Sequence, residues 1–223
     1  MQWQDEGYLL SKKNFNENSL IIEVLTLDHG KYNGIVYGGL SRKHKKNFQI
    51  GNKIMINWRS KSENKMGYFN IELLKPISPL FFDDKKRSIC ILAASSILKV
   101  LLPEHQINKK IYDSFENLLN KLSSNNWIKL YILWELSLVK ELGFEINLPD
   151  LKNSSNLPNY TFSINNSTYK IPKLLFEHSN ENATKAEIIE ALVFNKNLLL
   201  ENFIFPNKIR FPSSRNILEK YFN

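Results

Sequence analysis

A group of fixed positive charges lies in the first third of the sequence, and its chemistry is that of binding a polyanion. Residues 41–47 carry arginine or lysine at four positions, and residues 53–61 read as a strand with further cations. Alternate side chains of a strand share one face, so Lys53, Arg59 and Lys61 are expected to point outward together. Cations gathered on one face favour the phosphates of nucleic acid. The residues that we predict to contact phosphate are Lys31, Arg42, Lys43, Lys45, Lys46, Lys53, Arg59 and Lys61.

Aromatic residues lie among these cations. Tyr37 and Tyr68 occupy strand-like runs on either side of the basic segment and are predicted to stack on bases. Trp58 shares its parity with Ile54 and Ile56, so it is predicted to belong to the core instead.

No pattern in the sequence predicts catalysis. There is no phosphate-binding glycine loop and no paired-histidine metal motif. Cys90 has apolar neighbours on both sides and is interpreted as an inert buried thiol. Asp83 and Asp84 are explained by a helix N-terminus, with a metal site as the alternative. We therefore expect no catalytic residue, no metal and no cofactor, and the alternative is an enzyme whose site only the fold assembles.

Residues 1–78 are predicted to be all-β, in five short runs. A small closed barrel fits this pattern, and the OB-fold is the commonest five-stranded kind that binds single strands. An SH3-like barrel fits it equally well. The predicted strands are residues 7–15, 19–27, 32–40, 53–61 and 67–74.

Residues 79–223 are predicted to form an α-helical domain with a small β-hairpin insertion, which makes the whole chain α+β. The helix over 127–142 is apolar nearly all round, so it is expected at the centre of its domain. The helix over 184–203 is expected to break near residues 195–197. The other predicted elements are helices over 83–102, 107–122 and 213–222, and a hairpin of 160–164 with 168–171.

The net charge of +8 and a pI near 9.4 favour an anionic partner. The heavy use of Asn, Lys and Ile offers a second explanation, AT-rich coding, which raises the charge without a functional reason. The sequence has no long apolar run and no signal-peptide pattern, so we expect a cytoplasmic, nucleoid-associated protein.

The sequence resembles the RecO family of bacterial recombination mediators. The resemblance covers nearly the whole chain and rests on the order and spacing of several short motifs. They are His29-Gly30-Lys31, Gly38-Gly39, Ser41-Arg42-Lys43, the run Phe48–Asn52 and the helix-ending segment Trp134–Leu148.

The resemblance implies an N-terminal OB-fold, an α-helical C-terminal domain and no enzymatic catalysis. It also implies binding to single- and double-stranded DNA and annealing of complementary strands. The implied partners are RecR, the acidic C-terminal tail of the single-stranded DNA-binding protein (SSB), and indirectly RecA, which is loaded onto SSB-coated DNA.

One departure from the family matters for metal binding. Many members carry four cysteines that form a zinc site after the central helix, whereas residues 145–172 here contain none. We therefore interpret this segment as a remnant of that region and predict no zinc. An RNA-binding OB-fold protein in translation or RNA processing remains the alternative, because its barrel would carry the same charge.

Overall fold

The computed structural model describes residues 1–41, 47–62, 66–144, 161–164, 167–175 and 183–223. The chain forms two compact units. The first contains Met1–Leu119 with Pro212–Arg215, and the second contains Asn120–Phe211 with Asn216–Asn223. The first two long helices thus belong to the same unit as the barrel, beyond the domain boundary that we predicted at residue 78.

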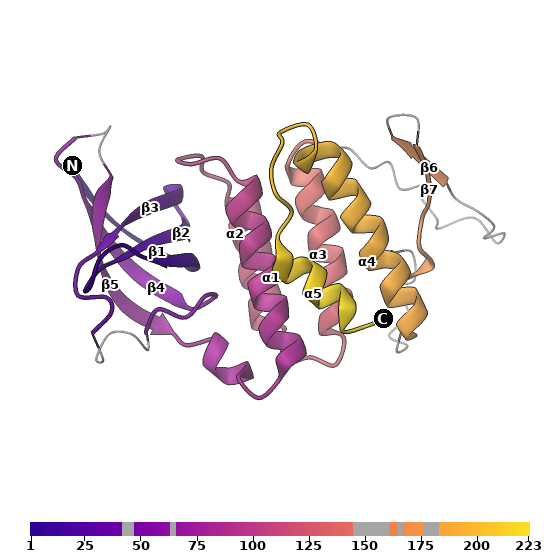
Figure 1. Ribbon diagram of the computed structural model, residues 1–223, viewed down its shortest axis with the longest axis horizontal. Coiled ribbons are helices and arrows are strands. Elements are labelled where there is room, and N and C mark those ends of the chain that lie inside the picture. The colour runs from indigo at the N-terminus through magenta and orange to yellow at the C-terminus, as the bar shows by residue number, and fades with distance from the viewer. Residues whose placement is uncertain (42–46, 63–65, 145–160, 165–166, 176–182) are drawn as a thin grey trace. The chain divides into compact units, whose positions relative to one another are not determined.

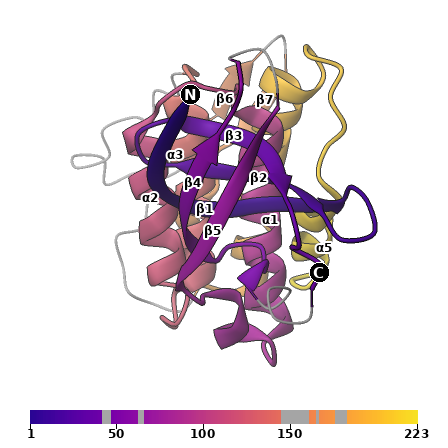
Figure 2. The ribbon, with the colours of Figure 1, turned by 90° about the vertical axis from the view of Figure 1, so that its left-hand side faces the viewer.

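The five predicted strands form a closed barrel in the order β1-β2-β3-β5-β4 (Figures 1 and 2). Neighbouring strands are antiparallel except β3 and β5, which are parallel. This is the Greek-key arrangement of an OB-fold. The strands are β1 (Gln2–Asn14), β2 (Leu20–Thr26), β3 (Gly30–Val36), β4 (Lys53–Arg59) and β5 (Gly67–Lys75).

The alternation predicted for β4 is confirmed, because Ile54, Ile56 and Trp58 are all buried in the barrel core. β1 is long enough to pair with both β2 and β4, and its pairing with β2 has an irregularity between Leu9 and Ser11. Such bulges bend a strand and increase its twist, which helps a small barrel to close.

Two helices pack in the same unit, after a short 3-10 turn, η2 (Ser78–Phe81). The first, α1 (Lys85–Leu101), begins where the Asp84 side chain accepts a hydrogen bond from the Arg87 backbone N–H. The helix-start interpretation of Asp83 and Asp84 is therefore confirmed for Asp84. Cys90 is fully buried on α1, which contacts β1.

The second helix, α2 (Lys109–Asn120), joins the barrel through a half-buried polar network. The Tyr8 hydroxyl donates to the Glu116 carboxylate at 2.7 Å. The Lys53 ammonium contacts Glu116 at 2.8 Å and Glu6 at 2.6 Å. Burial raises the pKa of Tyr8, so its hydroxyl keeps the proton that it donates.

This network gives the fold a specific dependence on pH. The hydrogen bond from Lys53 holds the pKa of Glu116 below its usual value. A carboxylate with a lowered folded-state pKa contributes stability above its unfolded pKa of about 4.3 and loses it as the pH falls through the folded value. We expect Glu116→Gln to lower the free energy of unfolding at neutral pH by about 1–2 kcal/mol, because the side chain is partly exposed.

Chemical denaturation across the acid range measures this effect. The Glu116→Gln variant should lose less stability than the unchanged chain between about pH 5 and pH 3. Glu17→Gln is the matched control, since Glu17 is exposed on the β1–β2 connection. An acid limb of the same steepness in both chains would contradict the role given to Glu116.

The second unit contains two long helices that lie side by side, α3 (Trp127–Glu141) and α4 (Lys185–Leu199) (Figure 1). α3 is buried nearly all round, as predicted, and even Glu135 is fully buried, where it accepts from the Tyr131 hydroxyl at 3.0 Å. A capping box at Thr184 begins α4.

The predicted break of α4 near residue 195 is wrong. The Asn195 side chain is fully buried and donates to the Ile132 carbonyl of α3 at 2.8 Å. Asparagine weakens an exposed helix, but here its amide links two helices, so α4 continues. It ends in a π-helical turn, η5 (Leu200–Ile204).

The predicted hairpin is confirmed as β6 (Thr161–Ile164) and β7 (Ser167–Lys170). Ile171 and Tyr169 pack in a core cluster with α3 and α4 residues, and a short 3-10 turn, η4 (Lys173–Leu175), follows. The last helix is α5 (Ser213–Lys220). None of the helices that the structure describes is long and apolar enough to cross a bilayer.

Candidate nucleic-acid interface

The outer face of the barrel presents a cross-strand row at one end of β1, β4 and β5. Arg59 of β4 lies between Gln2 of β1 and Tyr68 of β5 in the strand register. Side chains paired in this way share a face and lie close to one another. Arg59 is exposed, and Tyr68 keeps 42% of its surface in solvent. One guanidinium is thus offered to solvent between an amide and an aromatic ring.

The next row on the same face is uncharged. Asn57 of β4 pairs with Gln4 of β1 and Asn70 of β5. Carboxylates appear only one row further, where Glu6 and Glu72 flank Met55. The field at the Arg59 end is therefore not cancelled by an acidic neighbour in the same or the adjacent row, and this end suits a phosphate better than the rest of the face.

The two tyrosines predicted to stack on bases lie together. Tyr37 follows the end of β3 and is 67% exposed, and its ring centroid lies 6.3 Å from that of Tyr68. Exposed rings of this kind offer flat faces to bases of any sequence. Trp58 is only 7% exposed, so its assignment to the core is confirmed.

Two predicted phosphate contacts are not free on this face. Lys31 is 8% exposed, and its ammonium donates to the Lys99 carbonyl of α1 at 2.8 Å. Burial lowers the pKa of Lys31. Lys53 points outward from the barrel, but Glu6 and Glu116 hold its ammonium. Strand alternation predicts the face of the sheet on which a side chain lies, but not which elements cover that face. Here α1 and α2 cover Lys31 and Lys53.

Of the remaining cations predicted to contact phosphate, the structure describes Lys61 but not those of the basic loop. Lys61 is exposed on the β4–β5 connection, one of the loops through which OB-folds bind oligonucleotides. The basic loop, residues 42–46, lies outside the described residues, so the contacts of its cations remain predictions. These cations are Arg42, Lys43, Lys45 and Lys46.

Sequence reasoning missed an aromatic pocket at the same end of the barrel. It involves Trp3, Tyr32 and His29 from the strand region and His105 from the α1–α2 connection. The alternation of β1 and β4 would have placed Trp3 beside Trp58, which is its partner in the register. Nothing in the sequence indicates that His105 joins them.

The residues do not fit the zinc site that the resemblance would imply. The chain has a single cysteine, Cys90, which is buried on α1. Within the described parts of the chain, no group of three or more histidine, cysteine or acidic residues could hold a metal ion. The prediction that this chain binds no zinc remains a prediction.

Comparison with known proteins gives a consistent family assignment. The model of the recombination protein O N-terminal domain matches residues 1–77, and that of the C-terminal domain matches residues 83–150. The matched regions meet between β5 and α1.

Similar proteins carry the same family name. A DNA repair protein RecO of Wolbachia, from Drosophila simulans, is 34% identical over 150 residues, which is 66% of this chain and 62% of the relative. One from Hyphomonas neptunium is 34% identical over 153 residues, 67% of this chain and 63% of the relative. The matched stretch thus spans less than two thirds of these relatives' length. Both domain models and these relatives agree, and the chain belongs to the RecO family.

Proposed function

We propose that this chain acts in DNA repair and recombination by binding single- and double-stranded DNA on its barrel. The observation that carries the proposal is the exposed row of Arg59 and Tyr68 beside Tyr37, on a barrel of OB type. The name of these relatives, DNA repair protein RecO, gives the biological setting.

The mechanism is electrostatic and geometric and includes no catalytic step. Arg59, Lys61 and the predicted basic loop neutralise phosphates and release counterions. Tyr37 and Tyr68 stack on bases without reading their sequence. Neutralising two strands at once lowers their repulsion, which favours annealing of complementary strands.

The partners proposed for this chain are those that the family resemblance implies. The chain would act with RecR and contact the tail of SSB, so that RecA is loaded onto coated DNA. No bound cofactor or metal enters this mechanism. A protein with these partners would work at the nucleoid in the cytoplasm.

Competition between single-stranded DNA and RNA of one sequence tests the proposal. The full chain should bind the DNA with an affinity that falls as salt rises, by a logarithmic slope of about 0.7 for each phosphate contacted. DNA should compete at least as well as RNA. A clear preference for RNA would contradict the proposal and favour an RNA-binding role for the barrel.

A further inference from the structure

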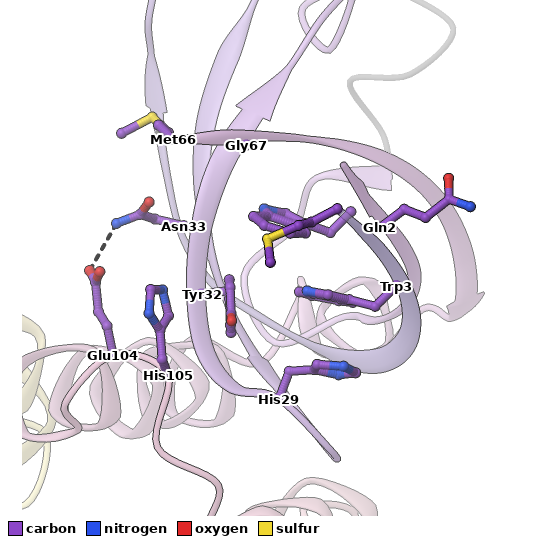
Figure 3. Close-up of a pocket in the computed structure, with 11 residues that line it drawn as sticks. Gln2, Trp3, His29, Tyr32, Asn33, Met66, Gly67, Glu104 and His105 are labelled. Carbon is purple, nitrogen blue, oxygen red and sulfur yellow. Dashed lines mark hydrogen bonds between the residues drawn. The ribbon is translucent and has the colours of Figure 1, made fainter. Parts of the chain in front are cut away.

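A pocket of about 1030 Å³ opens at the end of the barrel where β1 begins. Three strand residues, Trp3, Tyr32 and Trp58, contribute aromatic walls. His29, from the β2–β3 turn, and His105, from the α1–α2 connection, add two imidazole rings (Figure 3). All of these residues belong to the first compact unit.

The rings form two stacks that meet nearly at right angles. Trp3 lies parallel to His29 at 4.1 Å and to Trp58 at 5.5 Å. Tyr32 lies against His105 at 4.1 Å and turns its plane 77° from that of Trp3. A wall with flat faces in two directions suits a flat, rigid ligand that can stack on one face and contact the other by its edge.

Two buried donors in this wall have no partner. The indole nitrogens of Trp3 and Trp58 are buried and make no hydrogen bond within the described part of the chain. The Trp58 nitrogen lies so close to Gly67 that an added Cβ there would sit 2.2 Å from it. Indole N–H groups only donate, and buried donors are nearly always satisfied. Gly67 covers the Trp58 nitrogen, whereas the Trp3 nitrogen belongs to the pocket wall, where an acceptor atom on the rim of a ligand would satisfy it.

The rim of the pocket carries a paired amide and carboxylate. Asn33 donates to Glu104 at 2.8 Å at the rim (Figure 3). Among the described residues that line the pocket, there is no lysine or arginine side chain. An amide and a carboxylate can pair with the donor and acceptor edge of a base, whereas the carboxylate would repel an anion.

The pocket and the outer row lie at the same end of the same strands. Gln2 lines the pocket and pairs with Arg59, and Gly67 lines it next to Tyr68. We propose that the pocket holds one unstacked base of a single strand whose phosphates lie on the Arg59 row. This inference rests on the proposed DNA binding and adds to it a defined site for a nucleobase.

The α1–α2 connection is held in place as one wall of this site. His105 donates its backbone N–H to the Lys31 carbonyl at 2.9 Å, and Glu104 forms a parallel bridge with Lys31. Gly30 has φ of +77°, and a Cβ there would lie 2.2 Å from the Gln106 carbonyl oxygen. Glycine at this position thus lets the connection approach the barrel closely enough for His105 to stack on Tyr32.

Tryptophan fluorescence tests the site, because two of the chain's four tryptophans form it. In the full chain carrying Trp127→Phe and Trp134→Phe, the emission comes from Trp3 and Trp58 alone. A short oligothymidylate should quench this emission in a saturable way. An abasic oligomer of equal length offers the same phosphates, so it should bind, as measured by anisotropy, without quenching.

Other outcomes would overturn the inference. Equal quenching by both oligomers, or anisotropy changes without quenching by either, would leave DNA binding intact but exclude a base in the pocket. Quenching by an aromatic dipeptide as strong as that by the oligonucleotide would assign the pocket to a protein side chain. Absence of any binding would overturn both the site and the proposed function.

A variant made in the chain that keeps all four tryptophans gives an independent readout. His105 is exposed and has φ of 62°, so His105→Gly removes the ring without straining the backbone. It should weaken binding of the base-containing oligomer by about fivefold or more, the loss of one stacking contact. Binding of the abasic oligomer should not change. The control is Gln106→Ala on the same exposed connection, and equal effects of the two changes would contradict the site.

Discussion

Replacing Asn52 with alanine should lower the free energy of unfolding by about 2–4 kcal/mol. Asn52 is fully buried between the basic loop and β4. Its side-chain oxygen accepts from the backbone N–H groups of Ile77 at 2.9 Å and Ser78 at 3.2 Å. Alanine would leave both donors without this partner, and an unsatisfied buried donor costs far more than a hydrogen bond contributes.

The position of Asn52 makes the effect specific to the barrel. Its amide also donates to the Asn47 carbonyl at 3.3 Å, next to the basic loop, and its backbone carbonyl accepts from Leu9. One side chain thus joins the loop before β4 to the segment after β5. Equilibrium unfolding in urea measures the loss, with Asn70→Ala on the exposed outer face as the control. Equal stability of the two variants would contradict this role.

Removing Tyr37 and Tyr68 together should weaken binding to single-stranded DNA by about a hundredfold. Each ring gives a stacked base about 1–3 kcal/mol, and about 1.4 kcal/mol corresponds to a tenfold change in affinity. Because both side chains are on the exposed surface of the barrel, the double alanine variant should unfold at nearly the same temperature as the unchanged chain.

Two matched variants separate stacking from other effects. Tyr37→Phe with Tyr68→Phe keeps both rings and should keep most of the affinity. Phe15→Ala removes another exposed aromatic ring of the barrel, 53% exposed on the β1–β2 connection, and should leave the affinity unchanged. Anisotropy titration of a labelled oligonucleotide measures all four chains. A loss in Phe15→Ala as large as in the tyrosine double variant would show that the two tyrosines have no special role.

The barrel could be predicted because its strands carry a clear local signal. Ile54, Ile56 and Trp58 alternate with polar residues, and the structure buries all three. The site was predicted only in part, since alternation assigns a side chain to a face without showing its neighbours. Lys31 and Lys53 have carbonyl and carboxylate partners on α1 and α2, whereas Arg59 is exposed.

The parts that could not be predicted depend on contacts between distant segments. His105 reaches Tyr32 only because the α1–α2 connection pairs with β3. Asn195 stays helical because a carbonyl of α3 accepts its amide. Helix propensity and strand alternation describe a residue and its near neighbours, so neither pattern contains these contacts.

Annealing of complementary strands that are both coated with SSB tests the central claim most directly. The full chain should anneal the coated strands, and the rate should fall steeply as salt rises, because charge neutralisation by the barrel drives the reaction. The Tyr37→Ala, Tyr68→Ala chain should be slower at every salt concentration. Binding to bare DNA without annealing of the coated strands would contradict the claim that this chain is a recombination mediator.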